Sequence, residues 1–281
     1  MKKATVIIGA VLSGLILASA LLSLFWSPWD PSAVDAAHRY VGLGWPHILG
    51  TDGQGRDTAS RLLIGTQTTI IVGLASVAIA AVIGVPAGIF SGMAHKAAAQ
   101  IVGRASDILL ALPALLLAIL FAAARGASVA TATVAIGIAT IPVFQRMTRA
   151  ATLTVMGQDF VLAARVSGTT RPMIAVRHIL PNIAPLLGVQ AAASFSMAIL
   201  AEAGLSYLGL SAPPTTPTWG RMLRDANIFA GPAQAVIPGA AIALAVLAFN
   251  LLGDGLRDYL DPKLRDIGNT VLLTPVAGGS Q

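Results

Sequence analysis

The stretch that decides the fold is LLIGTQTTIIVGLASVAIAAVIGVPAGIFSGMA, residues 62–94, which contains no charged side chain. A hydrocarbon core about 30 Å thick is crossed by roughly 20 helical residues, so this stretch alone is long enough to span a bilayer. It is rich in Gly and Ala and lacks the alternation over about 10 residues that is typical of membrane barrel strands. A transmembrane helix is expected, because it pairs every backbone group within the segment.

Similar uncharged runs lie on both sides of this stretch, at 4–29, 108–124, 126–145, 179–201 and 226–253. Hydrophobic residues make up 56% of the chain and charged residues 11%, against about 25% charged residues in a soluble domain. We therefore predict an all-α integral membrane protein with about six transmembrane helices. The run at 108–124 is the shortest, and we expect it to tilt little or to be shielded by neighbouring helices.

Composition also excludes several classes of function. The chain has no cysteine, and its four histidines are widely separated, so we expect no disulfide, no thiol catalysis and no metal site. The net charge of +6 does not come from a basic domain, so nucleic acid is not an expected partner. Neither paired carboxylates nor a Ser-His arrangement occurs in the spans, and an intramembrane enzyme is therefore disfavoured.

The distribution of basic residues predicts the topology. With the N-terminus inside, six spans place all four lysines (Lys2, Lys3, Lys96 and Lys263) and most arginines on the cytoplasmic side. Both termini are then cytoplasmic, and the first helix is uncleaved because its apolar run continues to Trp26 and Trp29. We divide the chain into a first helix with an external loop (1–66), a transmembrane core (67–258) with a cytoplasmic loop at 155–182, and a C-terminal tail (259–281).

The cytoplasmic segment 146–182 carries five arginines and a single acid, Asp159. Its pattern predicts a short amphipathic helix, a break at Gly168 and a second helix that ends at Pro181. Two interpretations stay open. The segment is either an arginine-rich topology signal, or a docking surface on which Ala163, Ala164 and Gly168 allow a partner to approach closely.

The same segment resembles the EAA loop of ABC importer permeases, which docks into an ATPase subunit. The resemblance is carried by DFVLAARVSG (159–168) followed by HILPN (178–182). It implies that the residues coupling the chain to the ATPase are Asp159, Ala163, Ala164, Arg165, Gly168, Leu180 and Pro181. Leu162 stands where the motif has a glutamate, which puts a charged contact there in doubt.

Three other segments resemble the oligopeptide, dipeptide and nickel permease family, in the order found in its second permease subunit. They are LGTDGQGRD (49–57) with SRL (60–62), EAGLSYLGL (202–210) with PTWG (217–220), and NLLGDGLRDYLDP (250–262). The resemblance implies a type I permease fold in a bacterial inner membrane and an ATP-driven importer of di- or oligopeptides, with nickel or a metal chelate as the alternative cargo. It also implies a second permease, two ATPase subunits and a substrate-binding protein as partners.

The chain lacks the Walker A pattern, so ATP and Mg are expected on the partner ATPases and no cofactor in this chain. An ion-coupled secondary transporter is the rival class. It would use acids or histidines inside the membrane, and the spans contain only Glu202, at the end of a run.

Several polar residues and glycines have two open interpretations. Asp52, Arg56 and Asp57, with Arg61, are expected to pair with one another in the external loop, where His38 and His47 are expected to be solvated. Glu202 and Asn250 either pair structurally or line a transport path. The smooth helix face made by Gly84, Gly88 and Gly92 serves either packing within the chain or pairing with a second permease.

Overall fold

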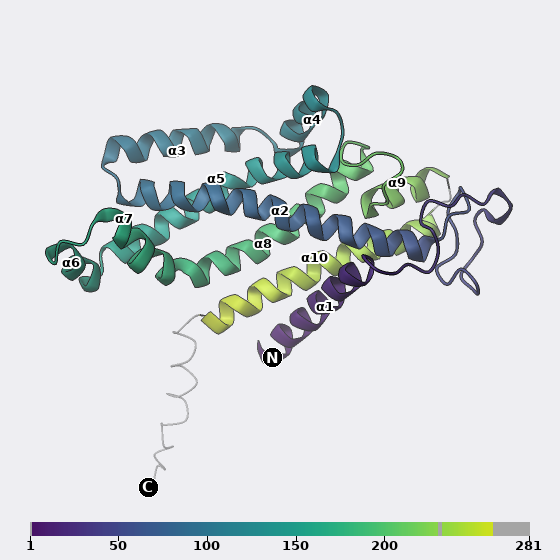
Figure 1. Ribbon diagram of the computed structural model, residues 1–281, viewed down its shortest axis with the longest axis horizontal. Helices are drawn as coiled ribbons and strands as arrows, with labels where there is room; N and C mark the ends of the chain where they lie inside the picture. Colours follow the sequence, from purple (N-terminus) through teal and green to yellow (C-terminus); the bar gives the residue numbers. More distant parts are fainter. Residues whose placement is uncertain (1, 230–231, 261–281) are drawn as a thin grey trace, which may run out of the picture.

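A computed structural model describes residues 2–229 and 232–260, and these ranges are almost wholly helical. The helices long and apolar enough to cross a membrane are α2 (Thr58–Met93), α5 (Val129–Met156), the continuous segment Arg171–Tyr207 and α10 (Pro232–Leu260), whose apolar part is Gln234–Asp258. Figure 1 shows them extending along the long axis, with α1 (Lys2–Leu22) beside α10. The predicted all-helical membrane fold is confirmed.

The run at 108–124 does not form the continuous span that we expected. Instead, α3 (Lys96–Ala111) and α4 (Ala114–Arg125) are separated by a bend of 81°. Pro113 has no N–H to donate and drives the preceding Leu112 out of the helical region, to φ −91° and ψ 118°. The described residues thus contain four long spans, a fifth if the bent pair counts as one, and the shorter apolar helix Val6–Leu22 within α1.

The helix expected to end at Pro181 continues past it. Arg171–Tyr207 consists of α7 (Arg171–Ile174), a π turn at Ala175–Ile179 and α8 (Leu180–Tyr207). Pro181 has no N–H to donate to a carbonyl in the preceding turn, and the helix accommodates the missing hydrogen bond by widening into a π turn. The side chain of Asn182 donates a 2.7 Å hydrogen bond to the backbone oxygen of His178, within this same turn.

The Gly84, Gly88 and Gly92 face packs within the chain, against α5. A Cβ atom at Gly88 would lie 2.5 Å from Thr148 Cβ and 2.7 Å from the backbone oxygen of Gln145, and Gly84 and Gly92 are equally tight. Because α5 already fills this face, the alternative that it pairs with a second permease is wrong.

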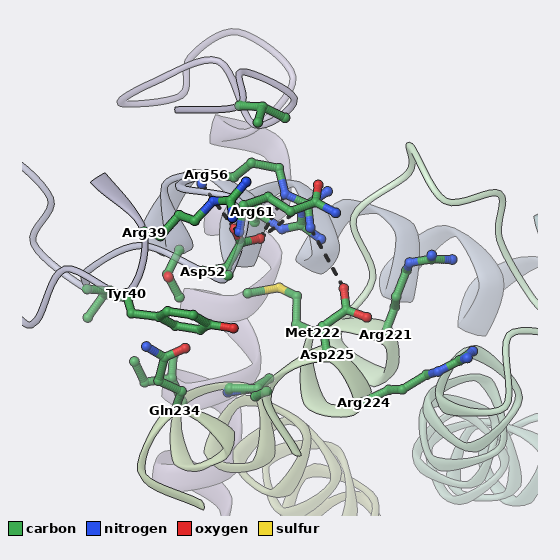
Figure 2. A pocket seen from close by; sticks show the side chains of 18 of the residues that line it. Arg39, Tyr40, Asp52, Arg56, Arg61, Arg221, Met222, Arg224, Asp225 and Gln234 are labelled. Atoms are coloured by element: carbon green, nitrogen blue, oxygen red, sulfur yellow. Dashed lines mark hydrogen bonds and ion pairs between the residues drawn. The ribbon is translucent and has the colours of Figure 1, made fainter. Parts of the chain in front are cut away.

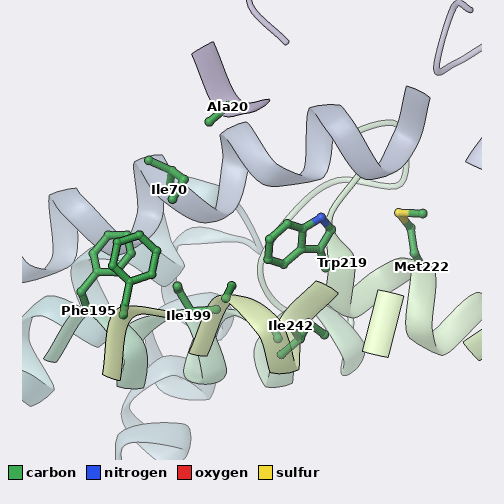
Figure 3. Close-up of a cluster of buried hydrophobic side chains, with 10 residues drawn as sticks. Ala20, Ile70, Phe195, Ile199, Trp219, Met222 and Ile242 are labelled. Atoms are coloured by element: carbon green, nitrogen blue, oxygen red, sulfur yellow. The ribbon is translucent and has the colours of Figure 1, made fainter. Parts of the chain in front are cut away.

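A buried cluster fixes the other end of α2 to its neighbours (Figure 3). Trp219 begins α9 (Trp219–Phe229), and its indole Nε1 donates a 3.0 Å hydrogen bond to the backbone oxygen of Leu62 in α2. The rings of Phe195 in α8 and Phe249 in α10 lie 4.3 Å apart in the same cluster. These contacts hold α9 in place beside the loop that precedes α2.

α1 and α10 pack closely in antiparallel fashion. A Cβ atom at Gly9 would lie 2.7 Å from the backbone nitrogen of Leu252, and one at Gly255 would lie 2.8 Å from Val6 Cγ2. The start of α1 and the end of α10 therefore lie at the same end of this helix pair, as the predicted topology requires.

Candidate functional site

The first candidate surface is the short helix α6 (Asp159–Val166), which connects α5 to the α7–α8 segment. Of its residues only Val161 is fully buried, in a cluster with Ile174, Ile179 and Ile183. Asp159, Ala163 and Arg165 are exposed. One buried apolar side chain therefore anchors a helix that leaves most of its residues exposed.

Gly168 ends this helix with φ +80°, a conformation that favours glycine, and a Cβ atom there would meet no neighbour within 4 Å. The break predicted from the sequence is present. Leu180 and Pro181 are exposed at the start of α8. The rings of Phe160 and His178 lie 6.1 Å apart, which brings α6 against the π turn.

Arg165 contacts the end of α5 and faces a cavity that the α2–α3 turn also lines. Its guanidinium donates to the sulfur of Met156 at 3.5 Å. It lines a cavity of about 450 Å³ together with His95, which precedes α3, and Arg171. Three basic or titratable side chains therefore face one space at the base of α6. Sequence reasoning missed His95, since nothing in its local pattern places it near residues 165–171.

The second candidate surface lies at the opposite end of α2, where Asp57 caps that helix. Its carboxylate accepts hydrogen bonds from the backbone N–H (2.7 Å) and the hydroxyl (2.8 Å) of Ser60, and from His47 Nδ1 (2.9 Å). His47 also packs against Trp29, with ring centroids 5.2 Å apart. The expectation that His47 is solvated is therefore wrong, because its imidazole, 16% exposed, completes the cap.

His38, by contrast, is exposed and bonds Asp35 at 2.7 Å. The hydrogen bond from His38 is the main cause that lowers the pKa of the Asp35 carboxyl. Each of the two loop histidines thus has its own carboxylate. No group of three metal-ligating side chains occurs in the part of the chain that the structure describes.

The expected ion pairs are present for Asp52, Arg56 and Arg61, whereas Asp57 bonds Ser60 and His47 instead of an arginine. Asp52 accepts from Arg56 Nε at 2.8 Å and lies 3.3 Å from Arg61 Nη1. The structure adds Asp225 from α9, whose carboxylate lies 3.8 Å from Arg56. Figure 2 shows how the loop and α9 bring these side chains together from two directions.

These residues line a cavity of about 760 Å³, walled by the loop before α2, by α9 and by the start of α10. Sequence reasoning found Asp52, Arg56 and Arg61 but missed Arg39, Arg221, Arg224 and Asp225. The signal was the run of charges three and four positions apart in WGRMLRD (219–225), which indicates one polar helix face. Which partner that face meets depends on the tertiary fold.

Glu202 is fully buried in α8. Its Oε1 accepts from the hydroxyls of Ser206 at 2.6 Å and Ser211 at 3.3 Å, whereas its Oε2 has no hydrogen-bond partner among the described residues. This geometry favours the structural interpretation, since the carboxyl ties α8 to the chain that follows it. Asn250 is exposed on α10 and is not part of that network.

Comparisons with known proteins agree with the geometry. Residues 84–266 match the family described as binding-protein-dependent transport system inner membrane component. The chain is 41% identical over 261 residues to the di/tripeptide transport system permease protein DppC of Pseudomonas aeruginosa, covering 90% of this chain and 86% of that protein. It is 39% identical to the glutathione transport system permease protein GsiD of Pectobacterium atrosepticum, covering 91% and 87%.

Among solved structures, the fold is similar to a chain of the MetNI methionine ABC transporter in an inward-facing conformation. The TM-score is 0.60 at 19% sequence identity, covering 71% of this chain and 96% of that chain. At this identity the similarity shows the fold alone.

Proposed function

Because the chain belongs to the family of inner membrane components of binding-protein-dependent transport systems, we propose that it is one permease subunit of an ATP-driven importer of di- and oligopeptides. The peptide cargo is supported by the similarity to di/tripeptide and glutathione permeases. We do not propose nickel or a metal chelate, because no observation on the described residues favours it.

The observation that carries the proposal is the largely exposed α6, in which only Val161 is buried and which is followed by the left-handed Gly168. We infer that it inserts into a separate ATPase subunit, with Asp159, Ala163, Ala164 and Arg165 on the docking surface and Leu180 and Pro181 beside it. ATP and Mg would be bound by two such ATPases. A second permease would complete the transport path, and a substrate-binding protein would meet the loop end of the bundle.

The helical segment that leaves α6 offers a route for coupling. α8 has 28 residues, so at 1.5 Å per residue it extends about 42 Å. Near the far end of α8, Glu202 accepts hydrogen bonds from Ser206 and Ser211. The next residue, Ala203, packs closely on α9, since a Cβ atom at Gly220 would lie 2.0 Å from the backbone oxygen of Ala203. A tilt of this helix, driven at α6, would therefore move the elements that form the loop end.

The test is to purify the tagged chain from its native membrane in mild detergent and to identify the proteins that co-purify. We expect a second permease and two ATPases with the native chain, and loss of the ATPases with Gly168→Trp. The matched control is Gly126→Trp. Gly126 has φ +84° and equally open surroundings, but it ends α4 and is separated from α6 by the 28 residues of α5, which extend about 42 Å.

If the Gly168→Trp variant still co-purifies with the ATPases, α6 is not part of the docking surface. If the chain purifies alone and transports in liposomes without ATP, the proposal of an ATP-driven importer is wrong and an ion-coupled secondary transporter is favoured instead.

A further inference from the structure

We propose that the cavity between the loop before α2 and α9 is a binding site for the carboxylate group of a small peptide, a proposal that rests on the peptide cargo proposed above. Its volume of about 760 Å³ falls within the range of roughly 300 to 1,000 Å³ typical of small-molecule sites.

The cavity carries more positive than negative charge. Five arginines line it, against two aspartates, Asp52 and Asp225. Asp52 is already occupied, because it pairs with both Arg56 and Arg61 and its other oxygen accepts from the backbone N–H groups of Gln54 and Arg56. The lining arginines are Arg39, Arg56, Arg61, Arg221 and Arg224.

Three of these arginines form no ion pair with a carboxylate of the described residues. The ion pairs to the two aspartates all come from Arg56 and Arg61, and none comes from Arg39, Arg221 or Arg224. Arg39 is contributed by the loop, and Arg221 and Arg224 by α9 (Figure 2). The unpaired positive charge is therefore presented to the cavity from two of its walls.

The position of Arg221 is costly without an anion. It lies in the first turn of α9, where the helix macrodipole is positive and disfavours a cation. Arg224 has a local reason for its place, since it covers Gly209 just beyond the end of α8, where a Cβ atom would lie 2.7 Å from its Nη1. Arg39 has no such contact, and the acid one turn beyond Arg221 on α9, Asp225, forms its ion pair with Arg56.

A carboxylate is the ligand that this arrangement fits. The planar guanidinium group donates two parallel hydrogen bonds to a carboxylate, a geometry that a water molecule or a single carbonyl does not match. Every unmodified peptide ends in such a group. The concave shape favours a small molecule over the surface of a second protein. We assign Arg39 on the loop wall and Arg221 on the α9 wall, which lie on opposite sides of Asp225 in Figure 2, as two separate contacts for the peptide carboxylate.

The experiment measures peptide binding to the assembled transporter in zwitterionic nanodiscs, without binding protein and without ATP. The probes are radiolabelled Ala-Ala and its C-terminal amide, which lacks the carboxylate, in equilibrium dialysis. We expect saturable binding of Ala-Ala and binding of the amide at least about tenfold weaker, which is the loss expected for one charge-assisted hydrogen bond.

The variants are Arg39→Gln with Arg221→Gln, and the control Arg125→Gln, which alters an exposed arginine outside the cavity. The double variant should bind Ala-Ala at least about tenfold more weakly, and the control should bind normally. Arg221→Lys, which keeps the charge but loses the planar fork, should fall between them.

Equal binding of the acid and the amide by the native chain, or no binding of either, would overturn the proposal even if the double variant fails to assemble. Normal peptide binding by the double variant, with weaker capture of the binding protein, would overturn it in favour of a protein-docking surface. ATP-dependent import of Ala-Ala by the same native preparation tests the proposed function separately. Import without binding in the cavity would refute only this inference.

Discussion

The carboxyl of Glu202 shows how a single residue in α8 can be interpreted from its partners. Its Oε1 receives two serine hydroxyls, and its Oε2 has no partner in the described part of the chain. The sequence marked this residue as a charge at the end of an apolar run, which is unusual in a membrane. Only the structure shows that Ser206 and Ser211 are the groups that hold it.

Replacing Glu202 by Ala should lower the free energy of unfolding by about 2 to 3 kcal/mol, because two buried hydroxyls lose their acceptor and a void remains. Glu202→Gln keeps the acceptor oxygen and should cost less than half as much. Thermal unfolding of the purified chain in one detergent would measure both. Equal destabilisation by Ala and Gln would mean that the ionised carboxylate, rather than the hydrogen bonds, is required.

The cap of α2 gives a second prediction for a single residue. Asp57→Ala removes the acceptor of Ser60 and His47 together, and we expect a loss of about 1 to 2 kcal/mol. Asp30→Ala is the control, since the exposed Asp30 side chain bonds close neighbours in the chain such as Ser32, and its loss should be close to neutral. Thermal unfolding checks both, and a neutral Asp57→Ala would show that the His47–Asp57 contact contributes nothing to stability.

At the scale of elements, two prolines with the same chemistry have opposite outcomes. Pro113 separates α3 from α4 with a bend of 81°, whereas Pro181 lies inside a continuous helical segment. The difference is that Ile174, Ile179 and Ile183 around Pro181 are buried in one cluster, so the segment keeps its direction and widens into a π turn. The lengths of the uncharged runs predicted the long spans, but the effect of each proline depended on packing that a single sequence does not reveal.

The α2–α5 contact gives a prediction at this scale. Gly88→Leu should destabilise the chain by about 3 kcal/mol or more, because the added atoms meet the backbone oxygen of Gln145, which has no room to move. Gly103→Leu in α3 is the matched control, since a Cβ atom there meets nothing within 4 Å. Yield and thermal unfolding in detergent compare the two. Equal behaviour of both variants would mean that α2 and α5 separate easily.

For the whole molecule, the sequence located the candidate surfaces less completely than the helices. The sequence predicted the short helix α6 and the break at Gly168, because these residues are consecutive. Half of the arginine-lined cavity was missed, because α9 reaches the loop through contacts between residues more than a hundred positions apart, such as Trp219 with Leu62 and Asp225 with Arg56. A site made of distant segments leaves no spacing in the sequence to detect.

Orientation in the membrane is the prediction that concerns the whole molecule, and the chain is suited to its test because it has no native cysteine. Leu43→Cys places a thiol at a 75% exposed position in the loop before α2, and Val166→Cys places one at a 90% exposed position at the end of α6. We expect a membrane-impermeant maleimide to label position 43 from the outside of spheroplasts and position 166 only in inverted vesicles. Co-expressed ATPases should protect position 166 and not position 43, because the proposed docking surface contains α6 and not the loop before α2. Labelling with the sides reversed would place the arginine-lined cavity in the cytoplasm, where it would not meet an incoming peptide.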